Sequence, residues 1–325
     1  MHPAFSVIFL TTLIGAGQGL FLALFTGQCY ALANFLPTQG AAFYAYGSLL
    51  ALGLLVGGLV ASFFHLGRPE RAWRTPTRWY ASWLSREVVL LPLVMGLIAA
   101  YGLAHALGFT QPFVTLGGWL AIDPSLVIGV AATLAAFALF VCTAMVYAGV
   151  PFPQEWRSPL TVANFTLFGL SSGFLLASAY AAYSVNGLLA VYGTWAVIFT
   201  LMALLSRFFS LHRNAHLKPR STLQSAIGVR HQVVVQKAQG FTGGSFNTRE
   251  FFHGRSPATL NWVRSGFLVL VFPVPLLLLA AAYLTHSATL PIAAFLVQYL
   301  GLLAERWYFF AEARHPQNLY YQSVA

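Results

Sequence analysis

The side chains best suited to chemistry lie in residues 62–87, SFFHLGRPERAWRTPTRWYASWLSRE. His65 ends one long apolar run, and Glu87 begins the next. An imidazole with a pKa near about 6.5 and a carboxylate at one boundary could exchange protons with a bound redox ligand. Four aromatic side chains of the same stretch could line a flat ring, or they could form the aromatic belt common at membrane interfaces. These are Trp73, Trp79, Tyr80 and Trp83.

A second group of candidates closes the last apolar run. Glu305 and Arg306 are adjacent within LGLLAERWYFF, before the sequence becomes polar. Charged groups at that depth are costly in lipid, so they indicate either an ion pair with a neighbouring helix or part of a polar pocket. Tyr147 and Trp156 could add a hydroxyl and an indole on the same face.

The histidines and cysteines give little support for a metal site. Of the nine histidines, three lie in or beside apolar runs: His65, His105 and His286. His105 and His286 could ligate one haem between facing helices, but both lie at the ends of runs, so we expect no haem. Cys29 and Cys142 lie within apolar segments and fit no zinc or iron–sulfur pattern. A transporter is disfavoured as well, because the two halves of the chain do not repeat.

The composition of the chain indicates that these candidate residues are held by membrane-spanning helices. Of the 325 residues 58% are hydrophobic and only 7% are charged, which excludes a soluble enzyme. Despite the net charge of +10, long uncharged stretches separate the basic residues, so a nucleic-acid partner is excluded too. Since a spanning helix needs about 20 apolar residues, we predict an all-α bundle of eight transmembrane helices. They lie near residues 6–32, 42–65, 88–108, 125–149, 162–184, 188–206, 265–285 and 289–310.

The charges give this bundle an orientation. With eight spans, both termini and the loops after spans two, four and six lie on one side, and all 17 Lys and Arg residues fall there. The other side carries only Asp123. Because loops rich in Lys and Arg stay in the cytoplasm, we predict that both termini are cytoplasmic.

One connection, residues 212–264, is long and basic within an otherwise single membrane domain that covers residues 1–325. It could be a solvated loop attracted to anionic lipid. Its aromatic content favours docking of a partner protein instead. The aromatic residues are Phe241, Phe246, Phe251, Phe252 and Trp262.

Several motifs resemble one known family. HLGRPER at residues 65–71, ASWLSRE at 81–87, VYAGVPFPQEW at 146–156 and the late AERWYFFAEARHP are similar to the membrane anchor subunits of dimethyl-sulfoxide-reductase-type molybdoenzymes. The resemblance covers most of the chain, and the first motif is the most specific. The long loop with GFTGGSFNTREFFHGR at 240–255 and the opening MHPAFSVIFLTTLIGAGQG look more like the anchors of cytoplasm-facing sulfite dehydrogenases.

The resemblance implies a haem-free, eight-span subunit of the bacterial inner membrane. Such a subunit exchanges electrons between a quinone, ubiquinone or menaquinone, and an iron–sulfur subunit that serves a molybdopterin catalytic subunit. It implies that His65 and Glu87 belong to the quinone site and that Gly67, Arg68 and Arg71 shape the adjacent loop. To these we add Trp83, Tyr147, Glu305 and Arg306 as candidate quinone contacts. A purely structural anchor and a haem-b subunit are the alternatives.

Overall fold

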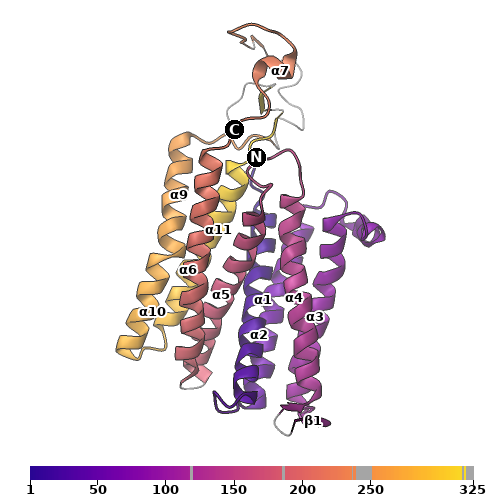
Figure 1. Cartoon of the computed structure of the whole chain (residues 1–325), viewed down its shortest axis with the longest axis vertical. Coiled ribbons are helices and arrows are strands. Elements are labelled where there is room, and N and C mark those ends of the chain that lie inside the picture. Colours follow the sequence, from indigo (N-terminus) through magenta and orange to yellow (C-terminus); the bar gives the residue numbers. More distant parts are fainter. Residues whose placement is uncertain (118–119, 185–186, 236, 239–250, 317, 320–325) are drawn as a thin grey trace.

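The chain folds into a bundle of long helices that run side by side (Figure 1). In this computed structural model the described residues are 1–117, 120–184, 187–235, 237–238, 251–316 and 318–319. Most of the motif at 240–255, with Phe241 and Phe246, lies outside them. The helices are α1 (Phe5–Leu32), α2 (Ala41–Phe63), η1 (Pro69–Arg78), α3 (Trp83–Ala106), α4 (Pro124–Ala148), α5 (Pro159–Ser184), α6 (Leu188–Ala215), α7 (Leu223–Ile227), α9 (Pro257–Val271), α10 (Pro273–Thr285) and α11 (Leu290–Glu312).

The helical membrane bundle predicted from the sequence is confirmed, with seven helices long and apolar enough to cross a membrane among the described residues. The seventh is α9 and α10 taken together, Pro257–Thr285. The last predicted span is also a helix, the 23-residue α11. It carries Glu305, Arg306 and Glu312 and is not among the seven, so the count of eight stays a prediction.

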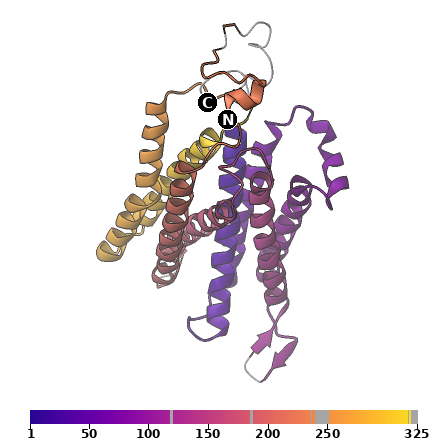
Figure 2. The same cartoon turned by 45° about the horizontal axis from the view of Figure 1, so that its top comes forward.

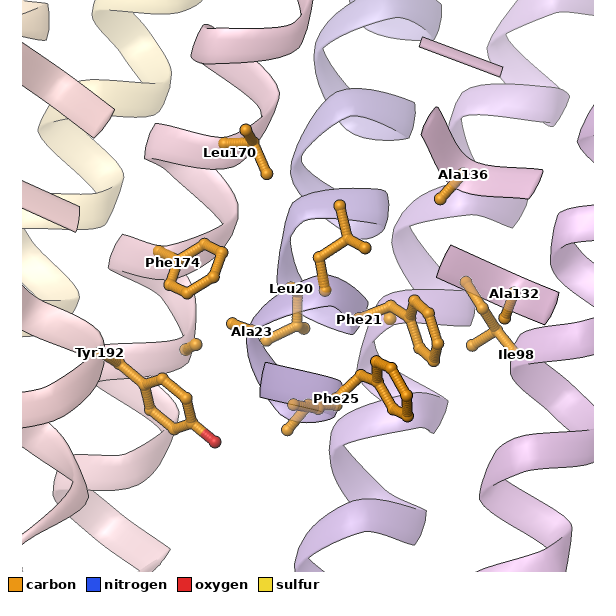
Figure 3. Close-up of a cluster of buried hydrophobic side chains, with 14 of the residues drawn as sticks. Leu20, Phe21, Ala23, Phe25, Ile98, Ala132, Ala136, Leu170, Phe174 and Tyr192 are labelled. Carbon is orange, nitrogen blue, oxygen red and sulfur yellow. The ribbon is translucent and has the colours of Figure 1, made fainter. Parts of the chain in front are cut away.

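The helices pack in two groups joined by α5. Helices α1 to α4 form one group, while α6, α9, α10 and α11 lie on the other side of α5. The central helix α1 is the most enclosed of the seven. Its Phe21 and Phe25 point toward Ile98 of α3 and Ala132 of α4, while Phe174 of α5 lies on the other side of α1 (Figure 3). The outer faces instead expose large apolar side chains, as expected for surfaces that meet lipid. Examples are Leu49, Leu93, Leu134, Leu205 and Leu277.

Glycines allow α1 and α5 to cross closely. A Cβ atom on Gly19 would overlap the carbonyl oxygen of Gly169, and one on Gly173 would overlap the backbone of Gly19. The spacing of Gly15 with Gly19 and of Gly169 with Gly173 is the small-xxx-small pattern of tightly packed membrane helices.

The structure corrects several predicted boundaries. Helix α3 begins at Trp83 rather than near residue 88, and α6 continues to Ala215 rather than ending at residue 206. A short antiparallel hairpin of β1 (Val114–Leu116) and β2 (Leu120–Ile122) adds strands to a fold predicted as all-α. The all-α expectation missed it because strands this short give no sustained period in the sequence.

The predicted span at 265–285 is also two helices, because the backbone breaks at Phe272 with φ −109° and ψ −76°. Pro275 has no N–H to donate to the carbonyl of Val271, four residues earlier. The side-chain amide of Gln298 in α11 supplies the missing donor, since Nε2 lies 3.2 Å from Val271 O. The same nitrogen contacts Ser171 Oγ at 3.0 Å and Thr200 Oγ1 at 3.3 Å. Gln298 therefore ties α5, α6 and α9 together at the break.

We expect Gln298→Leu to lower the free energy of unfolding by about 1–3 kcal/mol, because it leaves the buried Val271 carbonyl without a donor. Thr200→Val keeps the bond to Val271 and should cost less. Thermal unfolding of the purified chain in detergent would measure both variants. Equal stability of Gln298→Leu and the native chain would contradict this role.

Candidate functional site

Glu87 is a buried carboxyl near the start of α3. Its residue is 7% exposed, and Thr143 Oγ1 of α4 donates a hydrogen bond to Glu87 Oε1 at 2.8 Å. Ser82, whose side chain accepts from the N–H of Ser85, caps α3 just before it. Among the described residues no Lys, Arg or His forms an ion pair with Glu87. A carboxyl group with one hydrogen bond, from a hydroxyl, among the described residues is equipped to take up or release a proton.

Tyr147 lies one turn after Thr143 on α4 and connects Glu87 to the last helix. Its ring and the Arg306 guanidinium both contact Phe165. Its ring stacks on Phe165 at 5.5 Å between centroids and meets the edges of Phe309 and Phe310 at 5.8 and 5.3 Å. This aromatic packing fixes the Tyr147 ring one helical turn from Thr143, the hydrogen-bond partner of Glu87.

Glu305 and Arg306 form a buried ion network with α6, which decides between the two interpretations left open by the sequence. Arg207 Nε lies 3.0 Å from Glu305 Oε1, and Arg306 Nη1 lies 3.4 Å from Glu305 Oε2. Arg207 also approaches Glu312 Oε2 at 3.9 Å. Glu305 and Arg207 are 0% and 1% exposed. The adjacent pair is therefore an ion pair with a neighbouring helix.

Aromatic rings complete the surroundings of the two buried guanidinium groups. The Arg306 guanidinium lies 3.7 Å from the centroid of Phe165 and 5.5 Å from that of Phe309. That of Arg207 lies 5.6 Å from Phe267. A cation placed above the face of an aromatic ring is attracted to that ring, and the attraction is stronger where water is excluded.

His65 lies apart from this row, on the exposed segment between α2 and α3. Partial shielding by the chain lowers the pKa of its imidazole from the usual 6.5, so the neutral form prevails at pH 7. Gly67 and Arg68 are exposed beside it, and a Cβ atom on Gly67 would meet nothing within 4 Å. Arg71 pairs loosely with Glu70 at 3.9 Å, also in solvent. Within the described part of the chain no hydrogen bond or ion pair joins His65 to Glu87.

Trp83 joins the exposed segment to the bundle. The Arg86 guanidinium lies 4.2 Å from its ring centroid, and a Cβ atom on Gly149, which follows α4, would lie 3.1 Å from Trp83 Cδ1. The structure thus gathers the buried Glu87, Glu305 and Arg306 and the partly buried Tyr147 into one row, linked through Thr143 and Phe165. The loop residues 65–71 lie outside that row.

Three members of the row were missed from the sequence: Thr143, Arg207 and Glu312. Arg207 falls just beyond the predicted end of the sixth span at residue 206, so it counted as a loop residue. The sequence did hold a signal, since LLSRFFSL continues an apolar helix on both sides of Arg207.

The two histidines considered for haem have different surroundings, and the expectation of no haem stays a prediction. His105 is buried with its ring stacked on Tyr44 at 4.4 Å and against the edge of Tyr101 at 4.7 Å. His286 follows α10 in a left-handed conformation, with φ 52°. Among the described residues no group of three or more His, Cys, Asp or Glu side chains could hold a metal ion.

An open apolar groove of about 410 Å³ lies between α1 and α2, at the end of α2 that precedes His65. Phe9, Leu13, Val60 and Phe64 supply most of its apolar wall.

The connection after α6 packs over the same end of the bundle as η1 (Figure 2). Arg213 Nη2 donates to the carbonyls of Gln154 and Arg157 at 3.1 and 3.2 Å. Near the end of the connection, Phe251 stacks on His315 with centroids 3.8 Å apart. Arg213 lies in the last turn of α6, so the connection is held at the end of that helix and at Phe251.

Comparison with known proteins agrees with this architecture. The family model described as DMSO reductase anchor subunit (DmsC) matches residues 1–311. The chain is also 65% identical to a sulfite dehydrogenase subunit of Allochromatium vinosum over 325 residues, which is 100% of both chains. A family match over nearly the whole length, together with this identity, shows that the chain belongs to the DMSO reductase anchor subunit family.

Proposed function

We propose that this chain is the quinone-reactive membrane anchor of a molybdoenzyme complex. It takes electrons from an iron–sulfur partner subunit and passes them to ubiquinone or menaquinone in the membrane. The observation that carries the proposal is Glu87, a buried carboxyl with one hydrogen bond among the described residues, at the same end of the bundle as His65. Family membership supports it, because anchors of this family serve complexes with iron–sulfur and molybdopterin subunits.

Reduction of a quinone consumes two electrons and two protons, so the site must deliver protons to two oxygen atoms. In this proposal His65 collects protons from water and Glu87 holds one inside the bundle. The two residues act from separate positions, with His65 on the exposed loop and Glu87 beside Tyr147. The apolar groove between α1 and α2 is suited to the isoprenoid tail of a quinone that approaches His65 from lipid.

The partner's substrate follows from the 65% identical relative, whose name states that it belongs to a sulfite dehydrogenase. We therefore propose that the catalytic subunit oxidises sulfite and water to sulfate, releasing two electrons and two protons. The electrons leave through the iron–sulfur subunit to this chain, which itself carries no haem, iron–sulfur cluster or molybdenum.

The proposed arrangement in the bacterial inner membrane is eight spans with α11 as the eighth. Both ends of the chain and the connection 212–264 face the cytoplasm. All 17 Lys and Arg residues then lie on the cytoplasmic side, as the rule for short membrane loops requires. The iron–sulfur subunit docks on this basic face, above the buried row and beside His65. Attachment of the connection through Arg213 and Phe251 supports this role by fixing its two ends.

The direct test is His65→Ala in the assembled complex. We expect quinone-coupled turnover to fall about 100-fold or more, because general acid–base groups typically contribute that much. Electron transfer from the variant complex to a water-soluble artificial acceptor should continue at the native rate. This chain should show no haem absorption bands, whether native or carrying His65→Ala. Normal quinone reduction by the variant would remove His65 from the site. A quinone-analogue inhibitor that still binds the complex without this chain would favour a purely structural anchor.

A further inference from the structure

The segment η1 differs from every other long helix of the bundle in having no buried residue. It is a 3₁₀ helix of ten residues, PERAWRTPTR, with one acidic residue, Glu70. Its aromatic side chains face outward, with Trp73 at 69% exposure and the following Trp79 at 62%. Such exposure of indole rings needs a partner that the isolated chain does not supply.

The geometry of η1 sorts its side chains into ridges. A 3₁₀ helix has three residues per turn, so residues three apart lie directly above one another. Arg71, Arg74 and Thr77 form one ridge, while Trp73 and Pro76 form another that Trp79 extends. Arg78 lies on the third. The two ridges adjoin, and the Arg74 guanidinium lies 5.3 Å from the centroid of the Trp73 ring, so the segment presents arginine and indole side chains next to each other.

The attachment of η1 holds these edges at the end of α3. Arg86, in the first turns of α3, donates from Nε to Trp79 O and from Nη2 to Tyr80 O, each at 2.9 Å. Phe64 before η1 and Leu84 after it are 82% and 50% exposed, and both adjoin helices that meet lipid. Trp79 and Tyr80 are thus fixed beside exposed apolar side chains, at the level where spanning helices end.

Figures 1 and 2 both show η1, in purple between α2 and α3, projecting sideways from the bundle. The connection after α6 lies instead over the centre of that end. A sideways position at the boundary, with arginine and tryptophan side chains exposed together, fits the membrane interface. Indole rings favour the headgroup level, and arginine pairs with phosphate through two parallel hydrogen bonds.

We propose that η1 is a binding site for anionic phospholipid headgroups. Arg71, Arg74 and Arg78 contact lipid phosphates, and Trp73 and Trp79 rest at the boundary of the acyl chains. The site would hold a layer of anionic lipid around the end of the bundle that carries His65.

Hydrogen–deuterium exchange of the full chain in lipid nanodiscs tests this proposal. Amides of residues 69–80 should exchange several-fold more slowly in discs that contain phosphatidylglycerol than in discs of phosphatidylcholine alone. Replacing Arg71, Arg74 and Arg78 together by Ser should remove that difference. The expected loss in lipid preference is roughly fivefold per arginine, the size of one basic residue's attraction to an anionic surface.

Two further variants make the outcome specific. The same arginines changed to Lys keep the charge and should retain most of the lipid preference. Lys218, Arg230 and Lys237 changed to Ser remove an equal charge from the connection after α6 and should leave exchange of residues 69–80 unchanged. Equal exchange in both kinds of disc would overturn the proposal. Loss of co-purifying partner subunits in the Ser variant of η1, with no change in lipid dependence, would identify a protein surface instead.

Discussion

Replacing Arg207 by leucine is expected to cost about 3–5 kcal/mol of stability, because it breaks a buried ion network by removing one partner. Four charges share this network: Arg207, Glu305, Arg306 and Glu312. Without Arg207, the only ion pair that Glu305 retains among the described residues is with Arg306, and Glu312 loses its ion pair with Arg207. A net negative charge then remains where Glu305 is 0% exposed.

The comparison with an exposed arginine makes this prediction specific. Arg71→Leu removes a cation whose contact with Glu70 lies in solvent, so its effect should stay within about 0.5 kcal/mol. Adding Glu312→Gln to Arg207→Leu returns the network to zero net charge and should recover part of the loss. The stability of these three variants would be measured by thermal unfolding in detergent and by the amount of each protein found in membranes. If Arg207→Leu unfolds at the native temperature, the network does not stabilise the bundle.

The sequence predicted the membrane bundle well because each span contains its own signal, a long run of apolar residues. Pairing between helices has no such local signal. Glu305 and Arg306 were recognisable as buried charges, but their partner on α6 was not. The sequence around residue 305 does not indicate that Arg207 is the partner. The break at Phe272, in contrast, has a signal in the local sequence. Pro273 and Pro275 mark it in the sequence, yet only the structure reveals that Gln298 donates to the Val271 carbonyl, which Pro275 leaves without a donor.

In the candidate site too, the sequence predicted which single residues are buried but not which residues contact one another. Glu87 stands out in the sequence because a carboxyl at a helix start is costly in lipid, and it is buried as that argument requires. The sequence placed His65 at the membrane boundary near it, but closeness in the sequence is not contact. The row that includes Glu87 extends instead through Thr143 and Tyr147 on α4 toward Arg306 on α11. These residues are distant in the sequence and meet only through helix packing.

If Glu87 carries a proton to the quinone, Glu87→Gln should reduce quinone-coupled turnover by about 100-fold or more while the complex still assembles. Glutamine has nearly the same volume, and its amide oxygen still accepts the hydrogen bond from Thr143. The variant therefore changes little except the ability to bind and release a proton. Turnover with an artificial acceptor should remain native, since that route needs no proton within the bundle.

Two control variants separate proton transfer from packing. Thr143→Val removes the hydrogen bond at 2.8 Å but keeps the carboxyl group, so it should slow quinone reduction less than Glu87→Gln does. Glu87→Asp keeps an acid one methylene farther from the site and should retain part of the activity with a changed pH profile. Native quinone reduction by Glu87→Gln would mean that the buried carboxyl is structural. The proton path would then have to run through His65 alone, at the water boundary, and Tyr147 would pack between Glu87 and Arg306 without a part in it.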